Sequence, residues 1–233
     1  MTTNVCVGGV KAHGLNQQDR GGSIPASTLH LWFNEDHEAE RLVKSFHYSK
    51  RWPSNVQFVV TAHESGGLFG TKGDAVAAVV FSIPPTRWSI HVLELSRLVR
   101  HEERQVSLSW LIGHAIRQIK KRGLAELLVS FADAQQGHHG GVYRAANWRY
   151  AGQRRPSMEG VIVDGVFTPG RSANSRWGTR SPKKLAELGI DATAKWDEGK
   201  HLYWYPVTSK GDDAAKTVGL TDVDWKHSQA GER

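Results

Sequence analysis

The segment FADAQQGHHGGVYRAANWRYAG at residues 131–152 contains side chains that can move protons or bind ligands. Asp133 ends an apolar stretch, His138 and His139 stand in a glycine-rich turn, and Tyr143 follows in an expected short helix. A carboxylate at the end of a strand lies at the edge where open α/β sheets bind ligands. Asp133 is therefore a candidate to act as a base, orient an amine or bind a metal, and its structural alternative is to cap the turn.

The segment HYSKRW begins at His47 and places an imidazole, the phenol of Tyr48 and a hydroxyl close together. An imidazole ordinarily changes charge near neutral pH, so His47 is a candidate general base; the alternative is a favourable interaction with the end of the preceding helix. Together with Asp133 and His139 it would form a two-histidine, one-carboxylate iron site. The alternative for His138 and His139 is a role as simple turn residues.

Further polar candidates stand near helix starts. Ser109 lies at an expected strand-to-helix junction, where a helix N-terminus can receive a phosphate or carboxylate. Tyr143 and Asn147 are four residues apart and share one helix face. Tyr143 can exchange a proton, or it can be a buried structural tyrosine. Neither a P-loop nor a G-x-G-x-x-G fingerprint occurs, which argues against P-loop nucleotide hydrolysis and a Rossmann cofactor.

The chain carries 30 Lys and Arg against 23 Asp and Glu, a formal net charge of +7. Its basic residues are concentrated at residues 144–184, which suggests a polyanionic partner, nucleic acid ahead of membrane, and the alternative is a solvated basic face. Trp148 and Tyr150 lie among these cations and can stack on unpaired bases, although tryptophans are usually core residues. The candidate DNA-binding cations are Arg144, Arg149, Arg154, Arg155, Arg176, Lys183 and Lys184.

The composition excludes several classes of protein. Cys6 is the only cysteine, so no disulfide framework and no thiolate-only metal site can form. No segment approaches the 18 or more apolar residues typical of a membrane span, and the N-terminus does not resemble a secretory signal. The sequence therefore predicts a cytosolic protein that does not enter a membrane.

The hydrophobic patterns predict a mixed α/β domain with a partly parallel central sheet flanked by helices. The expected organisation is an irregular segment at residues 1–26, one domain at 27–207 and a polar tail at 208–233. Helices are expected at residues 34–47, 107–123, 139–148 and 181–189. Strands are expected at residues 56–64, 75–83, 90–100, 124–133 and 200–207, with a hairpin at 160–168 that turns at Asp164-Gly165.

Several motifs, in this order, resemble the phage Mom family of DNA adenine-modification proteins. They are FHYSKRWP, SIPPTRW, LELSRLV, ADAQQGHHGGVYRAANWRYAG, NSRWGTRSPKKLAELGI and KHLYWYPV, and the resemblance covers roughly residues 30–207. It implies a fold like that of the GCN5-related N-acetyltransferases. It also implies conversion of adenine in double-stranded DNA to N6-(carbamoylmethyl)adenine, which shields phage DNA from restriction in the cytoplasm of the infected bacterial host.

The resemblance also implies a set of site residues. Asp133 and His47 would handle the N6 proton, Arg87 and Ser109 would bind the donor, and Asn147 and Trp148 would contact the substrate. By position, the residues carried over from the family are His47, Tyr48, Arg87, Ser109, Asp133 and Tyr143.

The donor and the metal stay open at this stage. The junction RHEERQVSLSW lacks the glycines of the usual acyl-CoA loop, so both acetyl-CoA and a glycine-derived donor are compatible with the sequence. Iron is compatible with the His and Asp set. Two rival functions are a small-molecule N-acetyltransferase that uses acetyl-CoA and a non-catalytic DNA-binding protein that masks restriction sites.

Overall fold

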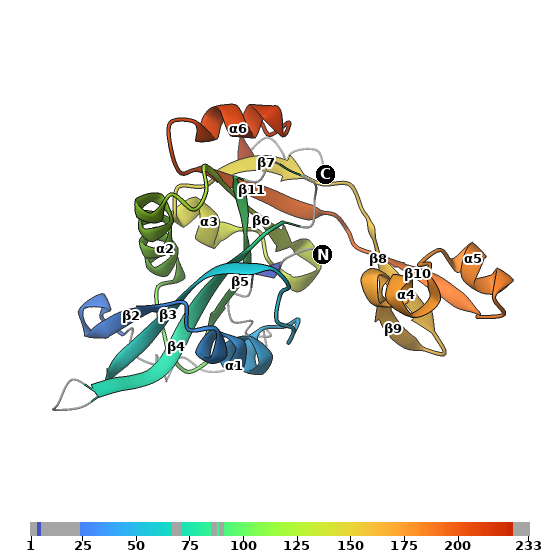
Figure 1. The fold of residues 1–233 in the computed structure, drawn as a ribbon, viewed down its shortest axis with the longest axis horizontal. Helices are drawn as coiled ribbons and strands as arrows, with labels where there is room; N and C mark the ends of the chain where they lie inside the picture. The colour runs from blue at the N-terminus through green and yellow to red at the C-terminus, as the bar shows by residue number, and fades with distance from the viewer. Residues whose placement is uncertain (1–3, 6–23, 67–70, 85–87, 89–90, 226–233) are drawn as a thin grey trace, which may run out of the picture.

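The computed structural model describes residues 4–5, 24–66, 71–84, 88 and 91–225 (Figure 1). An eight-stranded mixed sheet carries helices on both faces, which confirms the predicted α/β class, and a second sheet has three strands. The helices are α1 (Asp36–Phe46), α2 (Leu108–Arg122), α3 (Gly141–Ala145), α4 (Gly170–Trp177), α5 (Pro182–Glu187) and α6 (Gly211–Thr217). The strands are β1 (Asn4–Val5), β2 (Leu29–Phe33), β3 (Val56–Gly66), β4 (Thr71–Ser82), β5 (Val92–Arg100), β6 (Leu127–Asp133), β7 (Arg149–Gln153), β8 (Met158–Val163), β9 (Val166–Pro169), β10 (Ala192–Trp196) and β11 (Lys200–Pro206).

The large sheet has the order β2-β3-β4-β5-β6-β11-β7, with β1 beside β5. The pairs β5–β6 and β1–β5 are parallel, and the other pairs of this sheet are antiparallel. Strands β5 and β6 are joined through α2, because parallel neighbours need a long crossover connection. They pair only at Val92–Glu94 and Leu127–Val129. Beyond these positions β6 continues to Asp133, which places that carboxylate at the carboxyl edge of the sheet.

Helix α2 covers one face of the sheet, and the sequence predicted its limits. The Ser107 side chain accepts a hydrogen bond from the Trp110 backbone N, and Gly123 ends the helix in the left-handed conformation with φ 63°. Both features satisfy backbone groups that a helix end leaves unpaired. The apolar stripe of α2 packs into the largest core cluster, together with Tyr143 of α3.

The opposite face carries α1 and α6 (Figure 1). Leu42 and Val43 of α1 pack on β3, β4 and β5, while Ala215 of α6 packs on β6 and β11. Helix α6 lies within the segment that the sequence predicted to be a polar tail from residue 208. The chain is folded there because Ala215 and Leu220 are buried, a pattern too short to be read as a helix from the sequence.

A small lobe projects from the large sheet between β7 and β11 (Figure 1). It contains the sheet β10-β8-β9 with α4 and α5, and it has its own core of Val161, Ala173 and Leu185. The predicted hairpin is confirmed, since Asp164 and Gly165 both adopt positive φ at its turn. Helix α4 and strand β10 were not predicted, because their apolar residues are few.

Two other details differ from the sequence prediction. The N-cap position of α1 is Glu35, whose side chain makes no capping hydrogen bond, and not Asn34, which adopts a positive φ of 61°. Strand β2 pairs with β3, although its short segment gave no clear sequence signal. Of the segment 1–26 only residues 4–5 and 24–26 lie within the described parts of the chain. In those parts no helix combines the length and apolarity needed to cross a bilayer.

The turn before α3 provides a stability prediction. Gly140 has φ +70°, and a Cβ there would lie 2.1 Å from Cε2 of Tyr203, whose hydroxyl donates to the His139 carbonyl at 2.8 Å. Gly137 has a similar φ of +71° but open space around its Cβ position. Gly137→Ala should cost about 1–2 kcal/mol of left-handed strain. Gly140→Ala should cost about 1–3 kcal/mol more, because it also overpacks against Tyr203.

Urea denaturation of the two variants measures this difference. Because both substitutions carry the same backbone strain, equal losses of unfolding free energy would show that the contact with Tyr203 does not constrain the turn.

Candidate functional site

A cavity of about 970 Å³ lies between the carboxyl edge of β6 and the small lobe. Its size is at the upper end of the range of about 300–1,000 Å³ for small-molecule sites. The large sheet, the loop after α1 and the lobe each form part of its wall. The lining residues that bear charge are Arg51, Arg97, Asp133, Arg154, Arg155, Glu159, Arg171, Arg180, Lys195, Asp197 and Lys200.

Asp133 lies on this wall and is only 3% exposed. Its Oδ1 accepts a hydrogen bond from the Gln135 backbone N at 3.1 Å, which is the capping role that the sequence left open. Its Oδ2 lies 3.3 Å from Lys200 Nζ. The carboxylate therefore caps a turn and faces the cavity at the same time.

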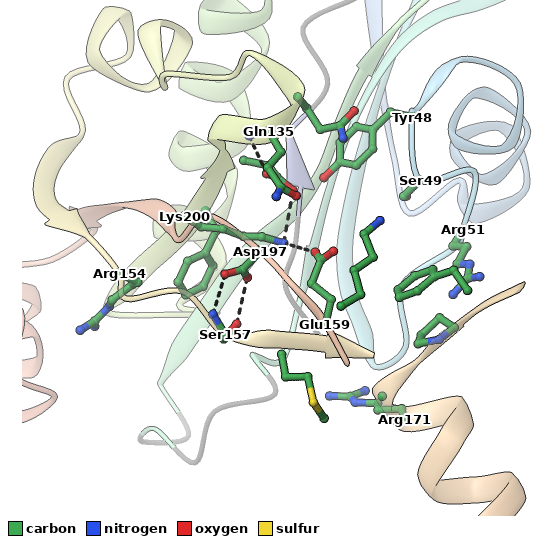
Figure 2. Close-up of a pocket in the computed structure, with 18 of the residues that line it drawn as sticks. Tyr48, Ser49, Arg51, Gln135, Arg154, Ser157, Glu159, Arg171, Asp197 and Lys200 are labelled. Carbon is green, nitrogen blue, oxygen red and sulfur yellow. Dashed lines mark hydrogen bonds and ion pairs between the residues drawn. The ribbon is translucent and has the colours of Figure 1, made fainter. Parts of the chain in front are cut away.

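Lys200 is the first residue of β11 and is 2% exposed. The antiparallel register places it directly opposite Asp133, so the two side chains lie on the same face of the sheet. Its Nζ is also 3.3 Å from Oε1 of Glu159 on β8, as Figure 2 shows. One buried ammonium thus joins a carboxylate of the large sheet to a carboxylate of the lobe.

The two chain segments that connect the lobe to the sheet are held by Asp197. Its Oδ1 accepts from the backbone N of Ser157 at 2.7 Å and of Gly199 at 3.0 Å, and its Oδ2 accepts from Ser157 Oγ at 2.9 Å. A Cβ on Gly199, which has φ +84°, would lie 2.0 Å from the Arg154 carbonyl oxygen. Only glycine fits this crossing, so the connection is tightly packed.

The loop after α1 forms a second part of the wall and is organised by His47. This imidazole is fully buried, and its Nδ1 accepts from both the backbone N (3.1 Å) and Oγ (2.9 Å) of Ser49. The Tyr48 ring stacks on His47 at 4.6 Å, lies 5.8 Å from the His138 ring and lines the cavity. Burial lowers the pKa of His138, and the Asp133 charge opposes this effect. His47 itself does not line the cavity.

The suggested iron ligands do not fit a metal site. Among the described residues no three His, Cys, Asp or Glu side chains are grouped so that they could hold a metal ion. His47 Nδ1 is bonded to Ser49, and His139 packs against His201 with the ring centroids 5.9 Å apart. Asp133 is engaged by Lys200. We therefore assign no step to iron.

Other sequence candidates lie away from the cavity. Tyr143 is fully buried, its hydroxyl is 2.6 Å from Ser130 Oγ, and burial raises its pKa far above the ordinary value. Trp148 packs against Tyr143 in the core, while Asn147 is exposed at the end of α3. Ser109 bonds with Ser107 in the first turn of α2. Arg87 lies outside the described residues.

The predicted DNA-binding cations separate into two groups. Arg149 forms an ion pair with Asp212, and Arg144 lies over the Trp225 ring at 4.5 Å, so both contact C-terminal residues. The other five lie on the lobe or at its connection and are exposed. They are Arg154, Arg155, Arg176, Lys183 and Lys184.

Glu94 is a fully buried carboxyl group on β5, facing the same side of the sheet as the cavity. Within the described parts of the chain neither of its carboxylate oxygens has a hydrogen-bond partner. Burial raises the pKa of Glu94 to about 8, although the charges of Arg97, Lys200 and Arg171 oppose the shift. Near neutral pH this side chain is therefore mostly a neutral acid.

Sequence reasoning missed Lys200, Glu159 and Asp197 as site residues. For Lys200 the available signal was a charged residue at the start of the otherwise apolar strand KHLYWYP. Glu94 gave a similar signal as a charged residue inside VLELSRLVR. Glu159 and Asp197 gave none, because their side-chain partners Lys200 and Ser157 lie 41 and 40 residues away in the chain.

Comparison with known proteins gives one family match. A model of the Mom protein family matches residues 31–219, which is more than half of the chain. No curated protein matches the chain.

Solved structures of acetyltransferases are similar to the chain at low identity. The ribosomal-protein-S5-alanine acetyltransferase from Vibrio fischeri has a TM-score of 0.47 at 9% identity, over 81% of this chain and 98% of that one. An acetyltransferase structure from Salmonella typhimurium with acetyl-CoA has a TM-score of 0.46 at 10% identity, over 78% of this chain and 95% of that one. Spermidine N-acetyltransferase from Vibrio cholerae with CoA and spermine has a TM-score of 0.41 at 10% identity, over 77% of this chain and 96% of that one. At these scores nothing about donor or substrate follows.

Lys200 should be essential for stability. Lys200→Met leaves Asp133 and Glu159 facing each other without their shared cation, which should cost about 3–5 kcal/mol of unfolding free energy. Lys195→Met, which changes an exposed lysine on the same cavity wall and removes its contact with the Phe167 ring, should change stability by less than about 1 kcal/mol. Chemical denaturation compares the two variants, and equal losses would remove Lys200 from this structural role.

Glu94 should make stability fall as pH rises. The ordinary pKa of 4.5 applies to the unfolded chain, so between pH 4.5 and about 8 the unfolded state loses a proton that the folded state keeps. Between pH 5 and 8 the wild-type protein should therefore lose on the order of 3 kcal/mol relative to Glu94→Gln. Denaturation at both pH values measures this, with the exposed Glu187→Gln as control. A pH dependence identical in all three proteins would contradict the burial argument.

Proposed function

The chain belongs to the Mom protein family, and on that premise we propose that it is a DNA-modifying transferase that converts adenine in double-stranded DNA to N6-(carbamoylmethyl)adenine. The observation that carries the proposal is the position of Asp133 on the wall of a cavity that is rimmed by arginine and lysine side chains. A carboxylate in such a cavity can take a proton from an amine while the cations hold a polyanion nearby.

The lobe provides the DNA-binding surface in this proposal. Arg176 on α4 and Lys183 and Lys184 on α5 are exposed there, and Arg154 and Arg155 lie where the lobe joins the sheet. These side chains reach phosphates without reading sequence, so they fix the duplex over the cavity mouth. Arg144 and Arg149 keep their contacts with the C-terminal residues in this arrangement.

The target adenine must leave the duplex before it can react, since pairing and stacking bury its N6 atom. Extrusion costs a few kcal/mol, which new contacts in the pocket offset. The cavity wall carries the aromatic rings of Tyr48, Trp52, Trp88, Phe131 and Phe167, and such rings stack on bases. Trp148 is buried in the core, so Tyr48 and its neighbours replace it as the stacking surface in the proposal.

The chemistry exchanges one N6–H bond for an N6–CH₂ bond. The donor carries the carbamoylmethyl group on a leaving group, which departs with the electrons of its bond to carbon. Asp133 accepts the N6 proton, and Lys200 and the Gln135 backbone N hold the carboxylate in place. His47 acts through the loop that it supports, by placing Tyr48 and Ser49 on the cavity wall.

The biological setting follows from the same proposal. Modified adenines no longer fit restriction endonucleases, so the enzyme protects phage DNA in the cytoplasm of the infected host. A glycine-derived donor fits this chemistry because it can carry the carbamoylmethyl group, whereas acetyl-CoA carries an acetyl group and belongs to the rival small-molecule acetyltransferase.

Asp133→Asn should abolish modification while keeping the fold, because Glu159 still pairs with Lys200 in that variant. The expected loss of modified deoxyadenosine is at least about 100-fold. Mass spectrometry of nucleosides from co-expressed plasmid DNA measures it, with Glu187→Gln as the matched control on the exposed end of α5.

Unmodified DNA from the wild-type protein would contradict the proposal. Tight acetyl-CoA binding would then favour the small-molecule acetyltransferase, and DNA binding that is indifferent to Asp133→Asn would favour a masking protein.

A further inference from the structure

We propose that Arg51, Arg171, Arg180 and Lys195 form an anion subsite inside the cavity, which binds a carboxylate or phosphate group of the small-molecule donor. The subsite rests on the proposed function for its role, because it assigns a place to the second substrate of that reaction. All four side chains line the cavity.

The carboxylates of the cavity are already satisfied by other groups. Asp133 and Glu159 share Lys200, and Asp197 accepts from Ser157 and Gly199. Across the described residues, no carboxylate forms an ion pair with the four cations. The cavity therefore has an excess of positive charge that an anionic ligand would neutralise.

Contacts within the protein position the backbone of Arg51 and the side chains of Arg180 and Lys195. The buried Arg97 donates from Nε to the Arg51 carbonyl oxygen at 2.9 Å, which fixes the backbone of the Arg51 loop. Arg180 packs against the start of α4, where a Cβ on Gly170 would lie 3.0 Å from its Cδ. Lys195 Nζ lies 4.7 Å from the centroid of the Phe167 ring. A fixed cation loses less conformational freedom when it binds an anion.

The subsite lies on the opposite side of the cavity from Lys200. Figure 2 shows Arg51 and Arg171 on one side, Lys200 and Asp197 on the other, and Glu159 between them. A donor anchored by its anionic group at Arg51 and Arg171 can extend its reactive end toward the carboxylates. An extruded base that approaches Asp133 would then meet it there.

The positions of the cations on α4, on α5 and in the loop between them distinguish this subsite from the outward part of the DNA-binding surface, while the DNA-binding Arg154 and Arg155 also line the cavity. Arg171 and Arg176 both lie on α4, but only Arg171 lines the cavity. Arg180, in the loop before α5, also lines it, whereas Lys183 on α5 does not. Outward cations contact the continuous phosphate backbone, while inward ones fit an isolated anionic group. Arginine is suited to this because its guanidinium binds carboxylate and phosphate oxygens in pairs.

Calorimetric titration of the whole protein with inorganic pyrophosphate and with malonate tests the subsite, since the two probes carry phosphate and carboxylate groups without a base. Arg171→Ala with Arg180→Ala should raise the Kd for the bound probe by about tenfold or more. Arg176→Ala with Lys183→Ala removes the same charge from the lobe and should change it less than about twofold. Arg51→Ala with Lys195→Ala repeats the test if the first pair disturbs folding.

Fluorescence anisotropy with a duplex distinguishes the donor from DNA as the source of the anion. Arg176→Ala with Lys183→Ala, the outward pair, should lower the affinity for the duplex and reduce the slope of its salt dependence by about 2. Arg171→Ala with Arg180→Ala, the cavity pair, should change both quantities less. Three outcomes would overturn the subsite: both probes fail to bind the wild-type protein, the two pairs of substitutions lose probe binding equally, or the cavity pair loses more DNA affinity than the outward pair. Nucleoside mass spectrometry reports separately on the proposed function, because probe binding requires no modified DNA.

Discussion

The structure of the site depends on one buried ammonium group. Lys200 lies between Asp133 of the large sheet and Glu159 of the lobe, 3.3 Å from each. Burying a cation is costly unless charge and hydrogen bonds compensate it, and Asp133 and Glu159 provide this compensation for Lys200. The ion pair with Glu159 links the lobe to the edge of the sheet beside the cavity. Asp197 supports the same junction by binding the backbone of both connecting segments.

The polar groups of the site do not all increase stability. Glu94 lies under the same face of the sheet with neither oxygen hydrogen-bonded among the described residues, and its burial favours the neutral acid. An apolar residue at this position would stabilise the folded protein more than a buried polar group without a hydrogen bond does. The presence of Glu94 beside Arg97 and Lys200 shows that this part of the sheet tolerates a cost in stability, as functional sites often do. Asp133, which faces the cavity, instead has a partner for each of its oxygens: the Gln135 backbone N for Oδ1 and Lys200 Nζ for Oδ2.

The cations have different surroundings that suit different anions. Arg144 and Arg149 contact C-terminal residues, the outward lobe cations meet solvent, and Arg51, Arg171, Arg180 and Lys195 line the cavity. A duplex presents its phosphates along a continuous backbone, and a donor presents one anionic group. The proposed DNA contacts and the anion subsite therefore use different cations, although Arg154 and Arg155 of the DNA-binding group also line the cavity, and Arg51 of the subsite lies in the loop after α1. His47 belongs to neither set, since its hydrogen bonds to Ser49 organise the cavity loop.

The sequence by itself determined the local features of this protein. The mixed α/β class, the limits of α2, the Asp164-Gly165 hairpin and the position of Asp133 at the end of β6 follow from periodicity, caps and turn residues that act over a few positions. The motifs also indicated the Mom family. Tertiary structure alone decided the lobe, the packing of α6 and the cavity. Strand β11 brings Lys200 opposite Asp133 from 67 positions away, and no local pattern encodes that register. Tyr143 was likewise an attractive proton donor in sequence, but packing against Ser130 and Tyr203 places it in the core, because burial depends on contacts between distant segments.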